Sequence, residues 1–167
     1  DISASGLITV AGGKWTTYRR MAEDAMTFAS RHKLLTKRRC VTGTTVLRGY
    51  APELAIADPY LREYGADAAE VEALARANPA LAERLDAALP YTFAQALYVV
   101  QHAMAYTVDD VLSRRTRALL LDAEAALRAA RRVGELIAAE LGRDATWVKA
   151  QVADFSRMVR ADYCLGR

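Results

Sequence analysis

Residues 123–142 read AEAALRAARRVGELIAAELG, the longest helical pattern in the chain. Alanine and leucine recur at three- and four-residue steps, which predicts a helix over Ala123–Leu141 with an apolar stripe that packs in a core. Gly142 follows directly and is a typical helix stop. Opposite the stripe lie three arginines, Arg128, Arg131 and Arg132. Such a basic face would also suit an acidic membrane surface, but packing of the stripe against neighbouring helices explains the same pattern and is preferred.

Helix-start signals precede this stretch from Asp58 onward. Asp58 followed by Pro59 predicts an N-cap with proline at the first helical position. Asp67 with Glu70, and Thr92 with Gln95, have the spacing of capping boxes. The helices expected from these signals are a short one closed by Gly65, one from Asp67 to near Asn78, a short one from Pro79, one after Thr92, and then Asp109–Leu121, Ala123–Leu141 and Thr146–Val159.

The first thirty residues differ from this helical pattern. Leu7–Ala11 is a short β-rich run that ends at Gly12 and Gly13. After it, apolar residues recur on one face at helical spacing from Trp15 to Ala29. The opening therefore predicts a strand, a glycine turn and a helix. A second β-like run, Cys40–Leu47, has no obvious partner strand.

The fold class predicted is mainly α, a small helical-bundle domain preceded by the last strand, turn and helix of an α/β domain. The domains expected are residues 1–30, the end of the α/β domain, residues 31–57, a connector, and residues 58–167, an all-helical domain. The first residue is Asp1, so we expect the chain to be a processed or excised piece of a longer protein.

Composition narrows the function classes. The 167 residues are 53% hydrophobic and 26% charged with a net charge of +3, which is typical of a globular protein and not of a disordered one. Arginine pairs are scattered along the chain rather than gathered on one face with aromatics, which argues against a nucleic-acid partner. Cys40 and Cys164 lack metal-ligand spacing and suit a reducing cytoplasm without a required disulfide. No apolar run is long enough to span a bilayer.

The glycine turn is a candidate anion site. Gly12 and Gly13 allow a ligand to approach the backbone, the first N–H groups of the following helix attract negative charge, and Lys14 adds a full positive charge. Thr16 and Thr17 carry hydroxyl groups that can cap the helix or bind a ligand. Glycine pairs also begin many helices that bind nothing, and neither a P-loop nor a GxGxxG motif is present. Local chemistry alone therefore indicates an anion-receiving corner without naming its ligand.

The stretch GLITVAGGKWTTYRRMAEDAM, residues 6–26, resembles the end of the flavin domain in FAD-dependent glycerol-3-phosphate dehydrogenases, which carry a strand, GGK-x-TTYR and a helix. The resemblance implies that the turn lies beside the pyrimidine edge of the flavin ring, where a helix N-terminus and a lysine stabilise negative charge. The cofactor-binding residues it implies are Gly12, Gly13, Lys14, Trp15 and Thr16. It also suggests that Lys14 binds the phosphate of the substrate.

A second resemblance lies in the helical part, where Tyr98 is followed by Asp110-Val-Leu-Ser-Arg114-Arg115-Thr-Arg117, the family's Asp-x-Leu-x-Arg-Arg-Thr-Arg pattern. Many family members have Glu where this chain has Ala103, so an ion pair made by that Glu is lost or replaced. Asp110 and Arg114 stand four apart on one helix face, and Arg115 and Arg117 can bridge neighbouring helices. We expect a structural or interface role for these four residues rather than contact with substrate phosphate.

No catalytic residue is expected within the chain. His102 has no carboxylate or nucleophile placed beside it by the sequence, and His32 falls in the polar connector. No GxSxG or HExxH motif and no metal-ligand cluster occurs. The family's GxGxxG unit would precede Asp1, so we expect the chain by itself to bind FAD weakly or not at all and to be inactive.

For the full-length enzyme the resemblance implies oxidation of glycerol 3-phosphate to dihydroxyacetone phosphate by hydride transfer to flavin, with electrons passed on to quinone. A related oxidase passes them to oxygen, and the sequence does not separate the two. A non-catalytic helical interaction or homodimerisation module is the alternative of another class. The expected location is cytoplasmic, with peripheral attachment to the cytoplasmic membrane open.

Overall fold

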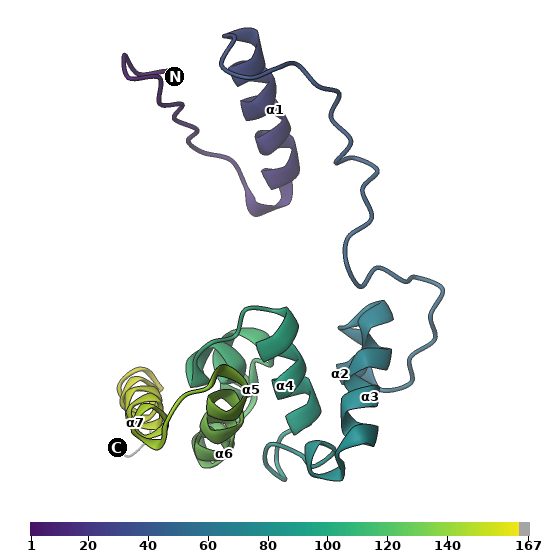
Figure 1. The fold of residues 1–167 in the computed structure, drawn as a ribbon, viewed down its shortest axis with the longest axis vertical. Helices are drawn as coiled ribbons and strands as arrows, with labels where there is room; N and C mark the ends of the chain where they lie inside the picture. The colour runs from purple at the N-terminus through teal and green to yellow at the C-terminus, as the bar shows by residue number, and fades with distance from the viewer. Residues whose placement is uncertain (164–167) are drawn as a thin grey trace. The chain divides into compact units, whose positions relative to one another are not determined.

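The computed structural model describes residues 1–163, which form two compact units, Asp1–Leu47 and Arg48–Arg167, the second described as far as Tyr163. Almost all of the secondary structure is helical (Figure 1). The mainly α fold predicted from the sequence is thus confirmed. The predicted domain bounds 1–30, 31–57 and 58–167 stay predictions.

The first unit contains one long helix. A 3-10 turn, η1 (Trp15–Thr17), leads into α1 (Tyr18–Arg31). Arg19 on α1 donates a hydrogen bond to the hydroxyl of Thr42, 3.1 Å away, which ties the stretch after the helix back to α1. Only Ala29 is buried among residues 1–47, so this unit has no apolar core of its own.

The predicted strand Leu7–Ala11 was wrong. Among residues 1–163, this stretch makes a single isolated β-bridge, between Ile2 and Ile8. A strand needs a neighbouring strand whose backbone pairs with its N–H and C=O groups. Within the described residues, Leu7–Ala11 has such pairing only at Ile8. Cys40–Leu47 is likewise not a strand but an irregular segment with a turn, in which the Thr44 N–H donates to the Val41 carbonyl.

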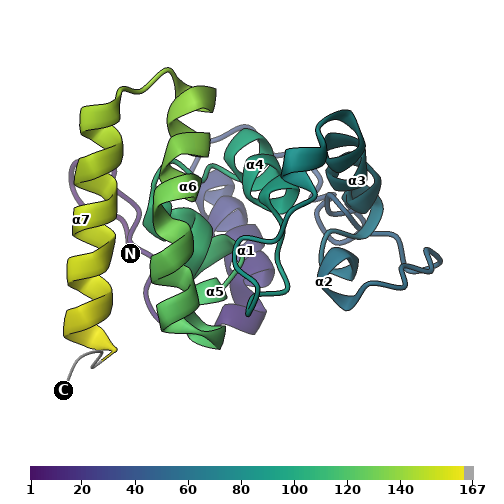
Figure 2. The ribbon, with the colours of Figure 1, turned by 90° about the horizontal axis from the view of Figure 1, so that it is seen from below.

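The second unit is a helical domain. Its elements in chain order are α2 (Pro59–Arg62), η2 (Gly65–Asp67), α3 (Ala68–Ala77), η3 (Pro79–Leu81), α4 (Phe93–His102), η4 (Asp110–Arg115), α5 (Ala118–Leu121), α6 (Ala123–Leu141) and α7 (Ala145–Asp162). Helix α4 is buried over most of its length. Helices α6 and α7 lie side by side, joined by a short turn (Figure 2). Both contribute to the core, α6 through Val133 and Ile137 and α7 through Phe155 and Val159, each at most 2% exposed.

Most helix ends follow the local signals in the sequence. The Asp58 carboxylate accepts a hydrogen bond from the Tyr60 N–H at 2.8 Å. The predicted capping box at Thr92 and Gln95 is present in both directions. Gly142 ends α6 in the left-handed conformation, with φ of +64°. Helix α7 begins at Asp144, whose carboxylate accepts from the Trp147 N–H, and is slightly longer than the predicted Thr146–Val159.

Two predictions about helices were wrong. The Asp67 side chain does not cap α3, because it accepts hydrogen bonds from the Tyr98 hydroxyl and from Arg48 instead. Asp109–Leu121 is not one α-helix but a π-helical turn, η4, followed by α5. Between them Arg117 adopts φ of +58°, which interrupts the helix, and its guanidinium bonds the Glu63 carboxylate at 2.8 Å.

The three arginines on the polar face of α6 are all paired. Arg128 binds Asp86 and Arg132 binds Glu83, both at 2.9 Å, while Arg131 binds Glu135 within the helix. Arg132 also lies over the Phe93 ring, with its guanidinium carbon 4.2 Å from the centroid. These contacts favour packing within the domain over a membrane surface. In residues 1–163, no helix is both long enough and apolar enough to cross a membrane.

The Asp86–Arg128 pair predicts an acid-sensitive contact. The hydrogen bonds from Arg128, at 2.9 and 3.0 Å, and then from the Ala88 N–H, lower the pKa of Asp86 to about 2. Because this pKa lies below that of an unfolded aspartate, about 3.9, the stabilisation is complete above that value and is lost as the pH falls to about 2. We expect Asp86→Asn to reduce the acid sensitivity, measured as the urea unfolding midpoint between pH 2 and 5. Parallel curves for the two proteins would contradict this.

Candidate functional site

The glycine turn is built by two consecutive residues in left-handed conformations. Gly12 has φ of +84° and Gly13 has φ of +98°. A Cβ atom on Gly13 would lie 2.1 Å from the Met21 sulfur, whereas one on Gly12 would meet nothing within 4 Å. Both positions favour glycine because of their backbone conformation, and a Cβ atom on Gly13 would in addition force the flexible end of the Met21 side chain to move.

Lys14 stands at the point where the helix begins. Its N–H donates to the Thr17 hydroxyl oxygen at 3.1 Å, and its carbonyl accepts from the Thr17 N–H at 2.9 Å. These bonds hold the first turn, η1, in place behind the two glycines. The first N–H groups of a helix have no intrahelical acceptor, so the turn presents donors to its surroundings. Thr17, and not Thr16, thus serves as the capping hydroxyl.

A hollow of about 560 Å³ lies between the glycine turn and α1. One wall is the backbone of residues 8–13, and the other is formed by Met21, Asp24, Ala25 and Phe28. Of the predicted cofactor-binding residues, Gly12 and Gly13 line this hollow, whereas Lys14, Trp15 and Thr16 lie outside its lining. The Asp24 carboxylate in the wall is paired with Arg20 at 3.2 Å.

Trp15 is the most exposed large apolar side chain of the turn, at 86% of its surface. Its ring contacts that of Tyr18, with centroids 5.6 Å apart. Several further apolar side chains of the first unit are also exposed, namely Leu7, Val10, Met26, Leu34, Leu35, Val41, Val46 and Leu47. So many exposed apolar side chains on one small unit are typical of a surface that packs against another protein segment.

Asp110, Arg114, Arg115 and Arg117 of the helical unit are held in internal contacts. Asp110 accepts hydrogen bonds from the N–H groups of Tyr106 and Thr107, each at 3.1 Å, and its own N–H donates to the Thr107 hydroxyl oxygen. Burial opposes ionisation of Asp110, but these bonds and the charge of Arg114 outweigh it, so its pKa lies below the usual value. The pair Thr107 and Asp110 therefore acts as a capping box at the start of the π-helical turn.

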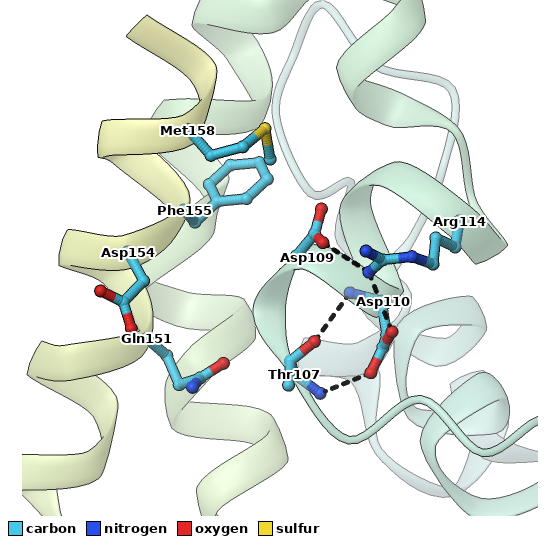
Figure 3. A pocket seen from close by; sticks show the side chains of 8 residues that line it. All are labelled: Thr107, Asp109, Asp110, Arg114, Gln151, Asp154, Phe155 and Met158. Carbon is cyan, nitrogen blue, oxygen red and sulfur yellow. Dashed lines mark hydrogen bonds and ion pairs between the residues drawn. The ribbon is translucent and has the colours of Figure 1, made fainter. Parts of the chain in front are cut away.

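Arg114 lies between two carboxylates, those of Asp109 and Asp110, the second at 3.0 Å (Figure 3). These side chains form one side of a pocket of about 460 Å³, and Gln151, Asp154, Phe155 and Met158 of α7 form the other. The charge of Arg114 is balanced within the protein, which leaves little attraction for a phosphate group.

Arg115 and Arg117 each bridge to another segment. The Arg115 Nε donates to the Ala103 carbonyl at 2.7 Å, and Arg117 bonds Glu63 beside α2. At position 103 the acceptor for Arg115 is thus a backbone oxygen. The contacts of all four pattern residues support the structural role expected for them, which stays a prediction.

Sequence reasoning missed two contacts around α4. His102 has a carboxylate neighbour after all, since its Nε2 lies 3.9 Å from Glu70 of α3, and its ring stacks 4.8 Å from that of Tyr98. The Tyr98 hydroxyl joins Asp67 and Arg48 in a hydrogen-bonded group. Arg48 is 19 positions from Asp67 and 50 from Tyr98, so no local spacing signals this contact.

The match to known proteins covers both units. The family model described as the C-terminal domain of alpha-glycerophosphate oxidase matches residues 7–148. The chain therefore belongs to this family of carboxyl-terminal domains, as the resemblance of residues 6–26 and 98–117 predicted.

Among its relatives are proteins named mitochondrial glycerol-3-phosphate dehydrogenase. The Mesocricetus auratus protein is 37% identical over 166 residues, which cover 88% of this chain and 22% of that protein. The Homo sapiens protein is 37% identical over 163 residues, covering 86% of this chain and 22% of the relative. A probable enzyme of this name from Dictyostelium discoideum is 37% identical over 138 residues, 72% of this chain and 21% of that protein. The chain thus spans about a fifth of the length of these relatives. No solved structure matches it significantly.

Proposed function

We propose that this chain is the carboxyl-terminal portion of an FAD-dependent glycerol-3-phosphate dehydrogenase, and that its first unit supplies one edge of the flavin site. The observation that carries the proposal is the corner formed by Gly12, Gly13 and Lys14, with a hollow beside it and the start of a helix behind it. The family match and the order of both sequence patterns support it.

The residues of the corner fit a planar, partly anionic ring edge. Two glycines without Cβ atoms let such a ring approach the backbone closely. The N–H groups of Trp15 and Thr16 at the helix start can donate to a ring oxygen or nitrogen. Lys14 adds a positive charge in the same place, where it would stabilise negative charge or hold the phosphate of glycerol 3-phosphate. When bound, the flavin would supply the hydride acceptor for oxidation of the substrate to dihydroxyacetone phosphate.

In this proposal the first unit supplies only part of the FAD site. Its exposed apolar side chains, such as Leu7, Val10 and Trp15, have the character of an interface, and a preceding FAD-binding domain of the parent protein would cover them. The proposed partner is therefore that domain. We further propose quinone as the electron acceptor of the parent protein, with oxygen as the alternative. The proposed location is cytoplasmic with peripheral membrane attachment, and the proposed assembly is a homodimer formed through the helical unit.

The proposed function is tested on the full-length parent protein and on this chain side by side. We expect the parent to purify with flavin absorbance and to reduce an acceptor dye only when glycerol 3-phosphate is added. We expect this chain, mixed with FAD, to remain colourless after gel filtration. A parent without flavin would overturn the assignment, and a stoichiometrically yellow chain would contradict the proposal that the site is shared with a preceding domain.

Within the same experiment, Lys14→Met in the parent tests the corner itself. The substitution removes the proposed contact of Lys14 with the flavin ring edge or with the substrate phosphate. It should lower kcat/KM for glycerol 3-phosphate by about ten- to a hundredfold. Lys37→Met, which removes a lysine of the same unit outside the corner, is the matched control and should leave kcat/KM unchanged. Equal activities of the two variants would exclude Lys14 from the site.

A further inference from the structure

Arg48 begins the helical unit and is hydrogen-bonded to two other segments. Its Nε donates to the Asp67 carboxylate at 2.7 Å, at the start of α3. Its Nη2 lies 3.3 Å from the Tyr98 hydroxyl of α4 and 3.5 Å from Glu70. Tyr98 in turn donates to the same Asp67 oxygen at 2.7 Å. The tyrosine is 5% exposed and belongs to the core helix, so Arg48 is anchored to the rigid part of the domain.

The backbone next to Arg48 is fixed as well. The Gly49 carbonyl accepts a hydrogen bond from the Ala66 N–H at 3.0 Å. Gly49 has φ of +78°, and a Cβ atom on it would lie 2.9 Å from the Tyr64 carbonyl oxygen. On the other side, a Cβ atom on Gly65 would lie 1.7 Å from the Gly49 carbonyl oxygen. Two glycines thus bring the two backbones into direct contact.

The Asp67 carboxylate binds Arg48 and Tyr98 and leaves the start of α3 without a side-chain cap. Its position and its spacing from Glu70 predict an N-cap for α3, yet it makes no capping bond. The hydrogen bonds from Tyr98 and then from Arg48 lower the pKa of Asp67 and keep it ionised. The carboxylate therefore contributes to the contact with Arg48 instead of to the helix.

The residues on either side of Arg48 make few other hydrogen bonds to the helices. Before it, Thr42 is bonded to Arg19 of the first unit. After it, the Ile56 carbonyl accepts from Arg62 at 3.2 and 3.3 Å. Between these points lie exposed residues, including Val46, Leu47, Tyr50 and Leu54. With Arg48 bound, the stretch between the Thr42 contact and the helical unit is residues 43–47, and with Arg48 released it would be residues 43–55.

We propose that Arg48, Asp67 and Tyr98 form a latch that sets the length of the tether between the two units. Opening the latch lets the contact between Gly49 and Ala66 break while the helical core stays folded. The effective concentration of one unit around the other falls as about the −3/2 power of the tether length. Lengthening the tether from residues 43–47 to residues 43–55 therefore lowers this concentration roughly fourfold.

The test measures hydrogen exchange of single amides in the whole chain by NMR. In Arg48→Met, which keeps the aliphatic stem but removes the guanidinium, we expect the Ala66 amide to exchange about three- to tenfold faster. Amides in the middle of α6, such as those of Val133 and Ile137, should keep their rates. Chymotrypsin should also cut after Tyr50 and Leu54 faster by a similar factor.

Tyr98→Phe is the second variant, because it keeps the ring in the core and removes only the hydroxyl that binds Asp67. It should accelerate exchange at Ala66 in the same direction. Arg157→Met, which removes an exposed arginine paired with Asp154 on α7, is the control. It should leave the exchange rates of the Ala66 amide and of the α6 amides unchanged. Unchanged exchange at Ala66 in both latch variants, or equal acceleration at Ala66 and in α6, would overturn the proposal. This outcome does not depend on whether the parent protein binds flavin.

Discussion

Gly65→Ala is expected to destabilise the helical unit by about 2–5 kcal/mol, since two separate costs add. Gly65 has φ of +55°, a conformation that costs a residue with a Cβ atom roughly 1–2 kcal/mol. The new Cβ atom would also lie 1.7 Å from the Gly49 carbonyl oxygen, and backbone cannot move aside as a flexible side chain can. The free energy of unfolding from urea titration, followed by circular dichroism, measures the loss.

Gly142→Ala separates these two costs. Gly142 has φ of +64° at the end of α6, but a Cβ atom there would meet nothing within 4 Å. We expect only the conformational cost, about 1–2 kcal/mol. If the two variants lost equal stability, the close contact between Gly49 and Gly65 would contribute nothing.

Phe155→Ala is expected to have an effect at least as large, about 3–5 kcal/mol. Phe155 is 2% exposed and packs between α7 and the rest of the core, beside the pocket that Figure 3 shows. Helix α7 has only three buried side chains, Val148, Phe155 and Val159, so removal of the largest one leaves a cavity at its main contact with α6. The same urea titration measures the change.

Leu120→Ala is the matched control for Phe155. Leu120 is also a large apolar residue of the helical unit, but 65% of its surface is exposed. We expect its replacement to change stability by no more than about 0.5 kcal/mol. A comparable loss in both variants would mean that α7 is not held by burial of Phe155.

The two units differ in what holds them together, and this difference bears on function. The helical unit has a continuous core that includes α4, α6 and α7. The first unit buries only Ala29 and keeps its largest apolar side chains exposed. These exposed apolar side chains agree with the proposal that Gly12, Gly13 and Lys14 complete a site built mainly by another domain.

Local chemistry predicted the helices well. The recurrence of apolar residues every three or four positions depends on neighbours within four positions, and so do the end signals at Asp58, Thr92 and Gly142. All three end signals occur as expected. The limits of α6 were predicted correctly because an apolar stripe and a C-terminal glycine agree there, and the structure adds an N-cap at Asp122. The glycine turn was recognised for the same reason, and its two positive φ angles bear out the need for glycine.

Predictions failed where a distant residue competes with a local one. Asp67 was expected to cap α3, but Arg48 and Tyr98 offer its carboxylate stronger, charge-assisted bonds. The helix expected over Asp109–Leu121 is interrupted at Arg117, a residue that does not favour a left-handed conformation, and its side chain is bonded to Glu63. Leu7–Ala11 has strand-forming residues, yet a strand requires a partner that the described residues do not provide.

By itself, then, the sequence determined the mainly helical class, most helix limits, the glycine corner and the family. Each of these depends on short-range periodicity, capping or a contiguous motif. Only the tertiary structure decided which carboxylates bind Arg48, Arg117 and Arg128. Those contacts join residues many positions apart, and their energies depend on distance and burial in the folded chain, which no local pattern encodes.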